Sequence, residues 1–588
     1  MNSLEKHFFF SDFFLRSWRP YIWLTLIASL PYLQILTFPE YTYYDDHFLI
    51  VDNFSHIDKW SNAGHAFLED VSHQGQGGNL YRPLLTISFI LSAKISGTTP
   101  FGYHLIDIIL HCVSCCLLFI ALQMLDYKRS LSFFGTLVFC VHPALAQAVA
   151  WIAGRNDSLL AIFILLSFIT YIKYCSTSLM MWYFLHLLCF VCAMFIKESA
   201  IMLPLLILFY SFHLKNEKIF SLKTVLLIVG WGIILFNWHI LRSASMVIPI
   251  GNKLQATTTV ISNLWISIYY FGKIFWPFHL AFAPISTDIH ITAGIISGCL
   301  LLFALLLSKR RDWKYIIFGL MWFFAFLIPT FYYNSGVHTP PKFYEHRIYL
   351  SFIGILFVLL SFSYTKRLGY LKRYFPLILF LLYISLGWLS YAHTFNFKNS
   401  LTLGEYDAST SPNDPRRYSD ITRMNIPKKL YQEIEAKQGR SQPQESNCNL
   451  VSKEELWEII DELKNQLRSN HNDPGLYHAL AVACFARGLF LSSEKYFLVA
   501  SQENPQDASI QYNLGILYYS AQPKMKAEKV WQQALRLDPT MGKVHLNLSY
   551  LYYESGQYQS AWVHCQKAMQ LGITVPSSLL NEIRGKIS

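Results

Sequence analysis

The chain has 588 residues, of which 53% are hydrophobic, 16% aromatic and only 14% charged, and its mean hydropathy is +0.30. Soluble proteins carry about a quarter charged residues, so this composition excludes a single soluble domain, a disordered chain and a disulfide-rich secreted module. It indicates a membrane protein with many crossings and a more polar region attached. The net charge of +11 fits basic cytoplasmic loops, and we expect no nucleic acid as a partner.

Apolar stretches long enough to cross about 30 Å of hydrocarbon recur up to residue 393. Short basic clusters separate them, and basic residues collect in cytoplasmic loops. If every cluster is cytoplasmic, the N-terminus is cytoplasmic too, and the sequence predicts eleven spans. These are 20–38, 101–125, 131–150, 156–174, 179–196, 199–213, 222–241, 291–308, 313–330, 346–364 and 374–393. An odd number of spans places the C-terminal region on the opposite face, in a periplasm or lumen.

Two further apolar stretches fit poorly as crossings. The stretch 83–95 is too short, and the stretch 264–284 is interrupted by Gly272, Pro277 and Pro284. We expect both to be re-entrant or interfacial helices at the outer face. If both cross instead, the chain has thirteen spans, and the C-terminal region keeps its side.

Beyond residue 393 the chain becomes polar, and a repeat emerges. Pro505 and Pro539 are 34 residues apart, which is the period of tetratricopeptide (TPR) repeats. In the register that starts at residue 508, small residues fall where two helices approach and large residues fill the space between them: Tyr512, Leu514, Gly515, Tyr518, Ala527, Trp531, Ala534 and Pro539.

Weaker copies of this pattern flank it on both sides. They predict repeats near 474–507, 508–541 and 542–575 within a TPR domain at 451–588. The intervening segment 394–450 is interpreted as a linker with room for one degenerate helical pair. Because TPR stacks present concave surfaces to extended peptides, a protein partner is expected.

The loop 39–100 after the first span carries two adjacent carboxylates, Asp45 and Asp46. Such a pair can supply a base and its orienting partner for an acceptor hydroxyl. The same pair could hold a divalent metal ion, or one member could simply cap a helix. No other metal site is predicted, because Cys112, Cys115 and Cys116 lie in a continuous apolar helix and suit core packing.

On this topology, further ionisable residues gather at the same outer face: Arg82, His142, Arg155, Lys197, Glu198, Glu345, His346 and Arg347. Charges beside a bilayer are costly and are therefore functional candidates, although each alone is also explained by snorkelling or an ion pair. Arginine and lysine that meet at one face can hold a phosphate. Together these residues predict a site for an anionic lipid headgroup beside the acidic pair.

Several runs of this sequence resemble the TMTC family, the transmembrane and TPR-repeat-containing O-mannosyltransferases. The runs are YYDDHFLIVDN, YRPLLTISF, TPFGYHLIDIILH, VHPALAQAVAWIAGRND, IKESAIMLPLL and YEHRIYLSFIG. Their order and spacing, with the appended repeats, extend the resemblance over most of the chain. Two departures look closer to bacterial relatives: His346 separates Glu345 from Arg347, which are adjacent as E-R in animal members, and Ser351 replaces a proline.

The resemblance implies a GT-C-type glycosyltransferase whose donor is a polyprenyl-phosphate sugar, often mannose. It implies Asp45 as general base with support from Asp46, and makes Arg82, Arg155, Lys197 and Arg347 candidates for contacts to the phosphate or sugar of the donor. The acceptor would be a Ser or Thr hydroxyl of a protein docked by the TPR array. The expected fold is all-α, a polytopic membrane bundle at 1–393 followed by a TPR solenoid, and the bacterial inner membrane is favoured over the endoplasmic reticulum.

The residues alone leave two other functions open. One is a non-enzymatic, membrane-anchored TPR scaffold for envelope assembly, which does not explain why acidic and basic residues gather at one membrane face. The other is a ligase or polymerase of lipid-linked glycans. A transporter is disfavoured, because few charges lie deep within the spans and no inverted repeat is evident.

Overall fold

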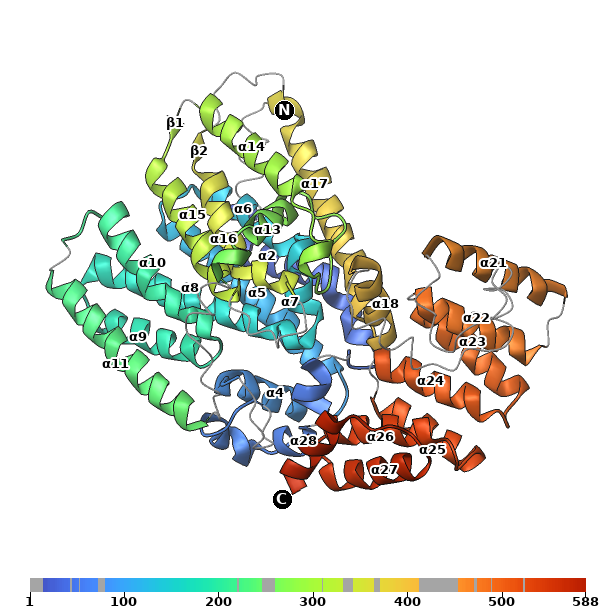
Figure 1. Ribbon diagram of the computed structural model, residues 1–588. Helices are drawn as coiled ribbons and strands as arrows, with labels where there is room; N and C mark the ends of the chain where they lie inside the picture. Colours follow the sequence, from blue (N-terminus) through green and yellow to red (C-terminus); the bar gives the residue numbers. More distant parts are fainter. Residues whose placement is uncertain are drawn as a thin grey trace. The chain divides into compact units, whose positions relative to one another are not determined.

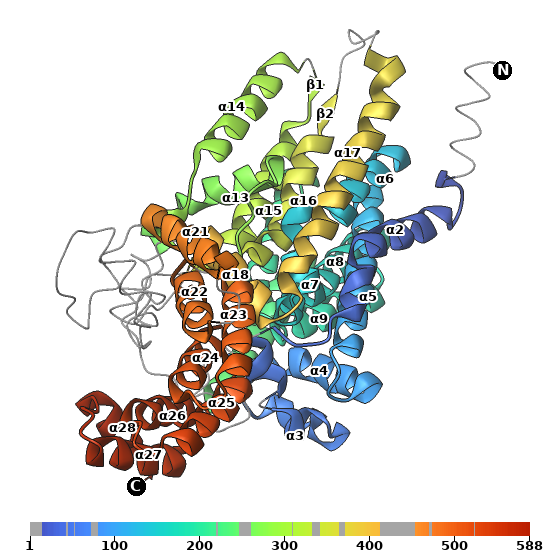
Figure 2. The ribbon, with the colours of Figure 1, turned by 90° about the vertical axis from the view of Figure 1, so that its right-hand side faces the viewer.

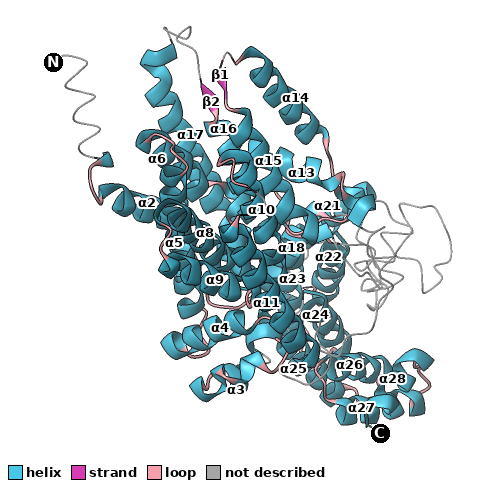
Figure 3. Ribbon diagram, turned by 90° about the vertical axis from the view of Figure 1, so that its left-hand side faces the viewer, coloured by secondary structure: helices cyan, strands magenta, loops and turns pink. Residues whose placement is uncertain are grey.

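The chain is predominantly helical in a computed structural model (Figure 3). The structure describes residues 14–42, 45–51, 53–71, 80–218, 221–245, 260–308, 310–331, 342–363, 371–411, 453–469, 473–487, 489–521 and 524–587. It divides into two compact units, Met1–Lys398 and Asn399–Ser588, which are described separately. The expected fold class, an all-α membrane bundle with a TPR-like solenoid after it, is confirmed.

The first unit contains, among its described residues, six helical segments long and apolar enough to cross a membrane (Figure 1). They are Arg19–Thr37 (α2 and η2), Phe101–Met124 (α5), Ile152–Thr177 (η7 and α8), Leu222–Ser245 (α11), Trp313–Phe331 (α15 and η11) and Leu377–Phe397 (most of α17, Leu371–Thr394, and η13). A seventh results if Arg129–Val141 (α6) and Pro143–Ala150, which meet at 58°, are counted as one broken span.

The predicted count of eleven spans is not confirmed. A straight crossing takes about 20 residues, and several helices at predicted spans are shorter: Met180–Met194 (α9), the broken segment Glu198–Leu214 that contains Leu203–Phe209 (α10), Thr292–Leu307 (α14) and Ile348–Leu360 (α16). The two stretches expected not to cross contain the short helices Pro83–Ser96 (α4) and Ile266–Phe275 (α13). Beyond Phe275 the second stretch is irregular rather than helical.

Close helix packing in this unit depends on small residues. Gly319 in α15 and Gly354 in α16 face one another so closely that a side chain on either would collide with the backbone of the other helix. Helices in an apolar solvent gain little from hydrophobic burial and associate through such contacts instead. Two short strands, Arg310–Arg311 (β1) and Phe362–Ser363 (β2), pair antiparallel beside these helices.

The second unit begins with Ser400–Thr410 (α18), which packs against the repeats through Gly404 and Phe490. Eight further helices follow within its described residues: Lys453–Ser469 (α21), Pro474–Arg487 (α22), Phe490–Glu503 (α23), Ala508–Ala521 (α24), Lys524–Leu537 (α25), Gly542–Glu554 (α26), Tyr558–Gln570 (α27) and Ser577–Ile587 (α28). Helices α22 to α27 form three successive hairpins (Figure 2). Most of the segment expected to be a linker, 412–450, lies outside the described residues.

Trp531 centres the middle hairpin. Its side chain is fully buried, and its indole Nε1 donates a hydrogen bond to the carbonyl oxygen of Tyr512 at 3.1 Å. Gly515 lies directly against the indole ring, and Ala527 and Ala534 are fully buried where α25 meets α24. Leu514 and Tyr518 are buried as well, and Pro539 lies in the turn before α26.

Replacing Gly515 by alanine should destabilise the second unit, because the new methyl group would overlap the Trp531 indole. Overpacking of this kind costs roughly 1–3 kcal/mol. Amide hydrogen exchange of α24 and α25 should therefore accelerate.

The matched control is Gly585→Ala in α28, where nothing lies within 4 Å of the new methyl group. Alanine is the better helix former by up to ~1 kcal/mol, so this variant should exchange no faster than the wild type. Equal exchange in the two variants would contradict the packing of Trp531 on Gly515.

Candidate functional site

The two adjacent carboxylates of the first loop have different surroundings. Asp45 is exposed, whereas the side chain of Asp46 is 1% exposed. Asp46 accepts hydrogen bonds from the backbone N–H of Ala153 at 2.8 Å and from the hydroxyl of Thr42. Asp46 is therefore fixed against the start of the α8 segment, while Asp45 is presented to solvent.

The protein shifts the acidity of both groups. Burial raises the pKa of Asp46 to about 8, against the hydrogen bonds from Thr42 and Ala153, which lower it. Burial among neighbouring protein atoms also raises the pKa of Asp45 above the ordinary value, although part of its surface stays accessible to solvent. The positive charges of Arg82 and Lys342 oppose that shift. A carboxylate with a raised pKa is a better proton acceptor near neutral pH, and Asp45 holds this property at an accessible position.

Four basic side chains form what we call the basic cluster: Arg82, Lys197, His346 and Arg347. Arg82 precedes α4, and its Nη2 lies 3.3 Å from Oε2 of Glu198. The charges of Arg82 and Arg347 act on Lys197, and all three cations act on His346. Segments that are distant in the sequence thus bring positive charge to one place.

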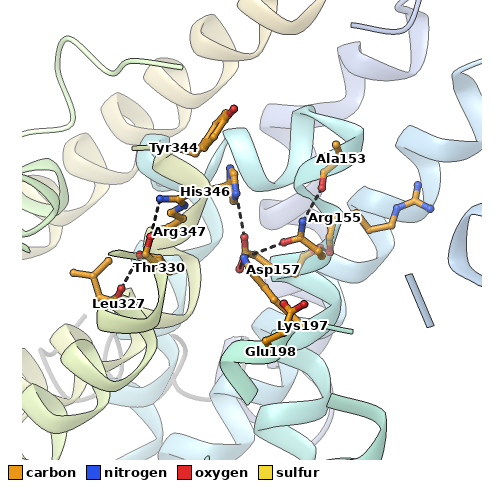
Figure 4. Close-up of polar contacts among 12 residues, drawn as sticks. Ala153, Arg155, Asp157, Lys197, Glu198, Leu327, Thr330, Tyr344, His346 and Arg347 are labelled. Carbon is orange, nitrogen blue, oxygen red and sulfur yellow. Dashed lines mark hydrogen bonds and ion pairs between the residues drawn. The ribbon is translucent and has the colours of Figure 1, made fainter. Parts of the chain in front are cut away.

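Asp157 in α8 joins two members of the basic cluster (Figure 4). Its Oδ1 lies 2.7 Å from Nζ of Lys197, and its Oδ2 lies 3.6 Å from Nε2 of His346. Nζ of Lys197 also donates to the side-chain oxygen of Asn156 at 3.1 Å. Asp157 therefore sets the spacing between Lys197 and His346.

Arg347 supplies positive charge that no acidic side chain of the described residues neutralises. Its Nη1 donates to the carbonyl oxygen of Thr330 at 3.0 Å, and its guanidinium lies 5.4 Å from the ring centre of Tyr344 (Figure 4). Neither contact carries a full negative charge. An anion bound beside Arg347 would meet a guanidinium with donors to spare, which is the geometry that suits phosphate.

Arg155 is engaged within the fold. It is 0% exposed, its Nε pairs with Asp107, and its Nη2 donates to the carbonyl oxygen of Tyr103 at 2.7 Å. Its Nη1 donates to Ser92 and Ser88. Arg155 thus ties α8 to α4 and α5, and its side chain points away from Lys197, His346 and Arg347 (Figure 4). Its contact with the donor stays a prediction.

His142 and Glu345 are also engaged within the fold. Nε2 of His142 donates to the carbonyl oxygen of Ile274 at 2.9 Å, and its Nδ1 accepts from the N–H of Ala144 at 3.3 Å. Glu345 is 1% exposed and accepts from the N–H of Ala281 at 2.7 Å. His142 thus bonds the last turn of α13, and Glu345 bonds the segment that follows it; contact of either residue with the donor stays a prediction.

Two residues near the site were not predicted from the sequence. Lys342 is 7% exposed, pairs with Ile285 in an isolated β-bridge, and acts electrostatically on Asp45. Its position three residues before Glu345 could have identified it as a candidate site residue. Gln147 is 1% exposed and bonds the backbone of His346, and a lone neutral amide inside an apolar run gives no such signal.

No group of three or more His, Cys, Asp or Glu side chains suited to a metal ion comes together in the described part of the chain. Both carboxylate oxygens of Asp46 already accept hydrogen bonds from the protein. Asp45 is thus the more accessible carboxylate of the pair.

Comparison with known proteins identifies relatives of part of the chain. No protein-family model matches. A part of 167 residues is 34% identical to Protein O-mannosyl-transferase TMTC1 of Homo sapiens, covering 26% of this chain and 18% of that protein. This part of the chain is similar to a TMTC protein.

Two further relatives give the same result. Protein O-mannosyl-transferase TMTC2 of Homo sapiens is 35% identical over 147 residues (23% of this chain, 18% of that protein), and tmtc2 of Xenopus laevis is 32% identical over 197 residues (29% and 23%). The chain therefore spans less than a quarter of the length of these relatives. Among solved structures, MamA 41-end from Desulfovibrio magneticus RS-1 aligns with 25% of this chain and 97% of its own at 19% identity, with a TM-score of 0.15 that supports no argument.

Stability should fall with rising pH through Asp46. Its pKa is about 3.9 in an unfolded chain and about 8 in the folded protein, so between these values the folded state binds the extra proton. Each pH unit in that window then removes at most ~1.4 kcal/mol of stability.

The measurement is thermal unfolding of the wild type and Asp46→Asn in detergent from pH 5 to pH 8. Other titrating groups are common to both proteins, so the difference between their slopes isolates Asp46. Asp46→Asn should lose less stability on going to pH 8 than the wild type. Parallel curves would contradict a buried, protonated Asp46.

The pair of Asp107 and Arg155 should behave as a structural unit. Arg155→Met leaves the carboxyl of Asp107 buried without its partner, which typically costs 3–5 kcal/mol. Asp107→Asn combined with Arg155→Met should cost less than the two single changes together, because no unpaired charge is left.

Thermal unfolding of the three variants measures this coupling. The control is Lys223→Met, which removes a lysine that bonds Ser178 at 2.8 Å and should change stability little. Additive losses from Asp107→Asn and Arg155→Met would show that the two side chains do not depend on each other.

Proposed function

We propose that this chain is an integral-membrane glycosyltransferase that moves a sugar from a polyprenyl-phosphate donor to a Ser or Thr hydroxyl of a protein. The observation that carries the proposal is the position of Asp45, an exposed carboxylate within charge range of Arg82 and Lys342 and next to the basic cluster. Similarity to relatives named protein O-mannosyl-transferases supports a protein acceptor and mannose as the sugar.

Asp45 acts as general base in the proposed reaction. It takes the proton of the acceptor hydroxyl as the hydroxyl oxygen attacks the anomeric carbon of the sugar. The bond between that carbon and the phosphate oxygen breaks, and its electron pair stays on the lipid phosphate. Direct displacement inverts the anomeric configuration. Asp46, anchored by Thr42 and Ala153, holds the chain at Asp45 in place.

The basic cluster stabilises the leaving phosphate. Negative charge grows on the phosphate as the bond breaks, and preorganised cations aimed at that charge lower the barrier. Arg347, which has no carboxylate partner among the described residues, makes the principal contact. Arg82 and Lys197, which are paired with Glu198 and Asp157, assist. Because these basic side chains supply positive charge, no metal ion is needed to neutralise the phosphate.

The second unit holds the acceptor polypeptide. Stacked helical hairpins present a concave face to an extended chain, and three such hairpins are present in α22 to α27. This supports a protein over a glycan as acceptor. We place the reaction at the outer membrane face, following the distribution of basic loops. We favour the periplasm of a bacterial inner membrane over an endoplasmic reticulum lumen because His346 and Ser351 resemble the pattern of bacterial relatives.

Sugar transfer should depend on Asp45. Membranes that contain the full chain are given radiolabelled polyprenyl-phosphate mannose, and label in protein is counted. Asp45→Asn should lower the transfer rate ~10²–10⁴-fold, the usual contribution of a general base. Glu69→Gln is the matched control, since Glu69 lies in the same loop and pairs with His56 at 3.9 Å away from the acidic pair, and its transfer should equal that of the wild type.

The three functions predict different places for the label. Label in protein that Asp45→Asn abolishes supports the proposal. Label only in glycan or lipid identifies a glycan ligase or polymerase. Absence of transfer by the wild type with mannose, glucose and other lipid-linked sugars identifies a scaffold.

A further inference from the structure

The stretch 342–347 carries three basic side chains, Lys342, His346 and Arg347, and lies against a second segment along its backbone. That segment, 278–285, connects α13 to α14, and we call it the strap. Ile285 and Lys342 form an antiparallel bridge, and the N–H of Phe343 donates to the carbonyl oxygen of Pro284 at 2.9 Å. The basic stretch is therefore held by the strap and not only by the start of α16.

Two side chains strengthen this attachment. The carboxylate of Glu345 accepts from the N–H of Ala281 at 2.7 Å, which joins the far end of the stretch to the strap. Nζ of Lys273 donates to the carbonyl oxygens of Phe278 and His279, and His279 has a φ of 51°. Lys273 thus fixes the beginning of the strap in a backbone conformation that side-chain-bearing residues rarely adopt.

Gln147 connects both segments to a third. It lies in Gln147–Ala150 (α7) and is 1% exposed. Its Oε1 accepts from the N–H of His346 at 2.7 Å, and its Nε2 donates to the carbonyl oxygen of Phe282 at 2.9 Å. One buried amide therefore satisfies one backbone group of the basic stretch and one of the strap.

The segment that carries Gln147 also anchors the acidic pair. Six residues later, the N–H of Ala153 bonds Asp46 at 2.8 Å. Gly154 packs so closely on the carbonyl of Gln147 that a side chain there would collide with it. The short segment between these residues therefore links the position of the acidic pair to that of the basic stretch.

We propose that Gln147 is a positioning residue for the transfer reaction, holding the basic stretch 342–347 and the strap 278–285 at a fixed spacing from the acidic pair. This inference rests on the proposed function. Loss of the amide would remove the bond to the N–H of the buried His346 and the bond to the carbonyl oxygen of Phe282, and the loss of buried hydrogen bonds is costly. Displacement of the basic side chains would follow, and misplacement of about 1 Å can cost 10²-fold in rate.

The experiment compares full-length Gln147→Met and Gln147→Glu with the wild type. Gln123→Met is the matched control, because Gln123 also bridges two groups, the carbonyl oxygen of Phe119 and the guanidinium of Arg129, but belongs to neither segment. The readouts are amide hydrogen exchange of 278–285 and 342–350, and the kcat and KM of transfer from polyprenyl-phosphate mannose.

Gln147→Met should accelerate exchange in both segments together and lower kcat ~10–100-fold, with the KM for the protein acceptor unchanged. Gln147→Glu keeps an oxygen that accepts from His346, so it should protect 342–350 better than Gln147→Met while leaving 278–285 fast. Gln123→Met should match the wild type in both segments. Acceleration in only one segment, or none, in Gln147→Met would overturn the inference.

The two proposals fail in different ways. An active wild type with unchanged kcat in Gln147→Met overturns the positioning role and leaves the proposed function standing. A wild type that transfers no lipid-linked sugar overturns the proposed function and, with it, any role of Gln147 in transfer.

Discussion

The cost of removing charge from water governs this structure. A buried ion must be paired, or its burial costs several kcal/mol. Asp107 and Arg155 satisfy this requirement through each other, and the further hydrogen bonds of Arg155 join three helices. Among the described residues Arg347 contacts a carbonyl oxygen and aromatic side chains but no carboxylate. That difference, more than the presence of charge, separates the structural ions of the bundle from those suited to an anionic substrate.

One break in the helical bundle organises the site. Between α6 and α8 the chain makes short helical turns, and residues of that region reach every part of the proposed machinery. Ala153 holds Asp46, Gln147 holds the backbone of His346, and Asp157 joins His346 to Lys197. A change in this region would shift the base and the cations together, which suits a reaction in which both must face one sugar phosphate.

The sequence predicted what depends on periodicity and composition. The helical class followed from apolar stretches and the 34-residue period, and Gly515 against Trp531 is the contact that such a repeat requires. Burial of individual charges could not be predicted, because Arg155 and Arg347 look alike until their partners are placed. The count of eleven spans is not confirmed for a related reason: the composition of α9, α14 and α16 predicts crossings, but these helices are shorter than a straight crossing needs. The attachment of the strap to 342–345 could not be predicted from the sequence, because it joins residues distant in the chain through their backbone atoms.

Binding of the product lipid tests the central claim most directly. The claim is that Arg347 receives the phosphate of a lipid-linked donor, so purified full-length protein should bind radiolabelled polyprenyl phosphate. Arg347→Met should weaken that binding about tenfold or more, since a charge-assisted contact contributes roughly 1.5–3 kcal/mol. Lys223→Met, a control lysine that bonds Ser178, should bind as the wild type does. Equal affinity of wild type and Arg347→Met would contradict a phosphate site at the basic cluster.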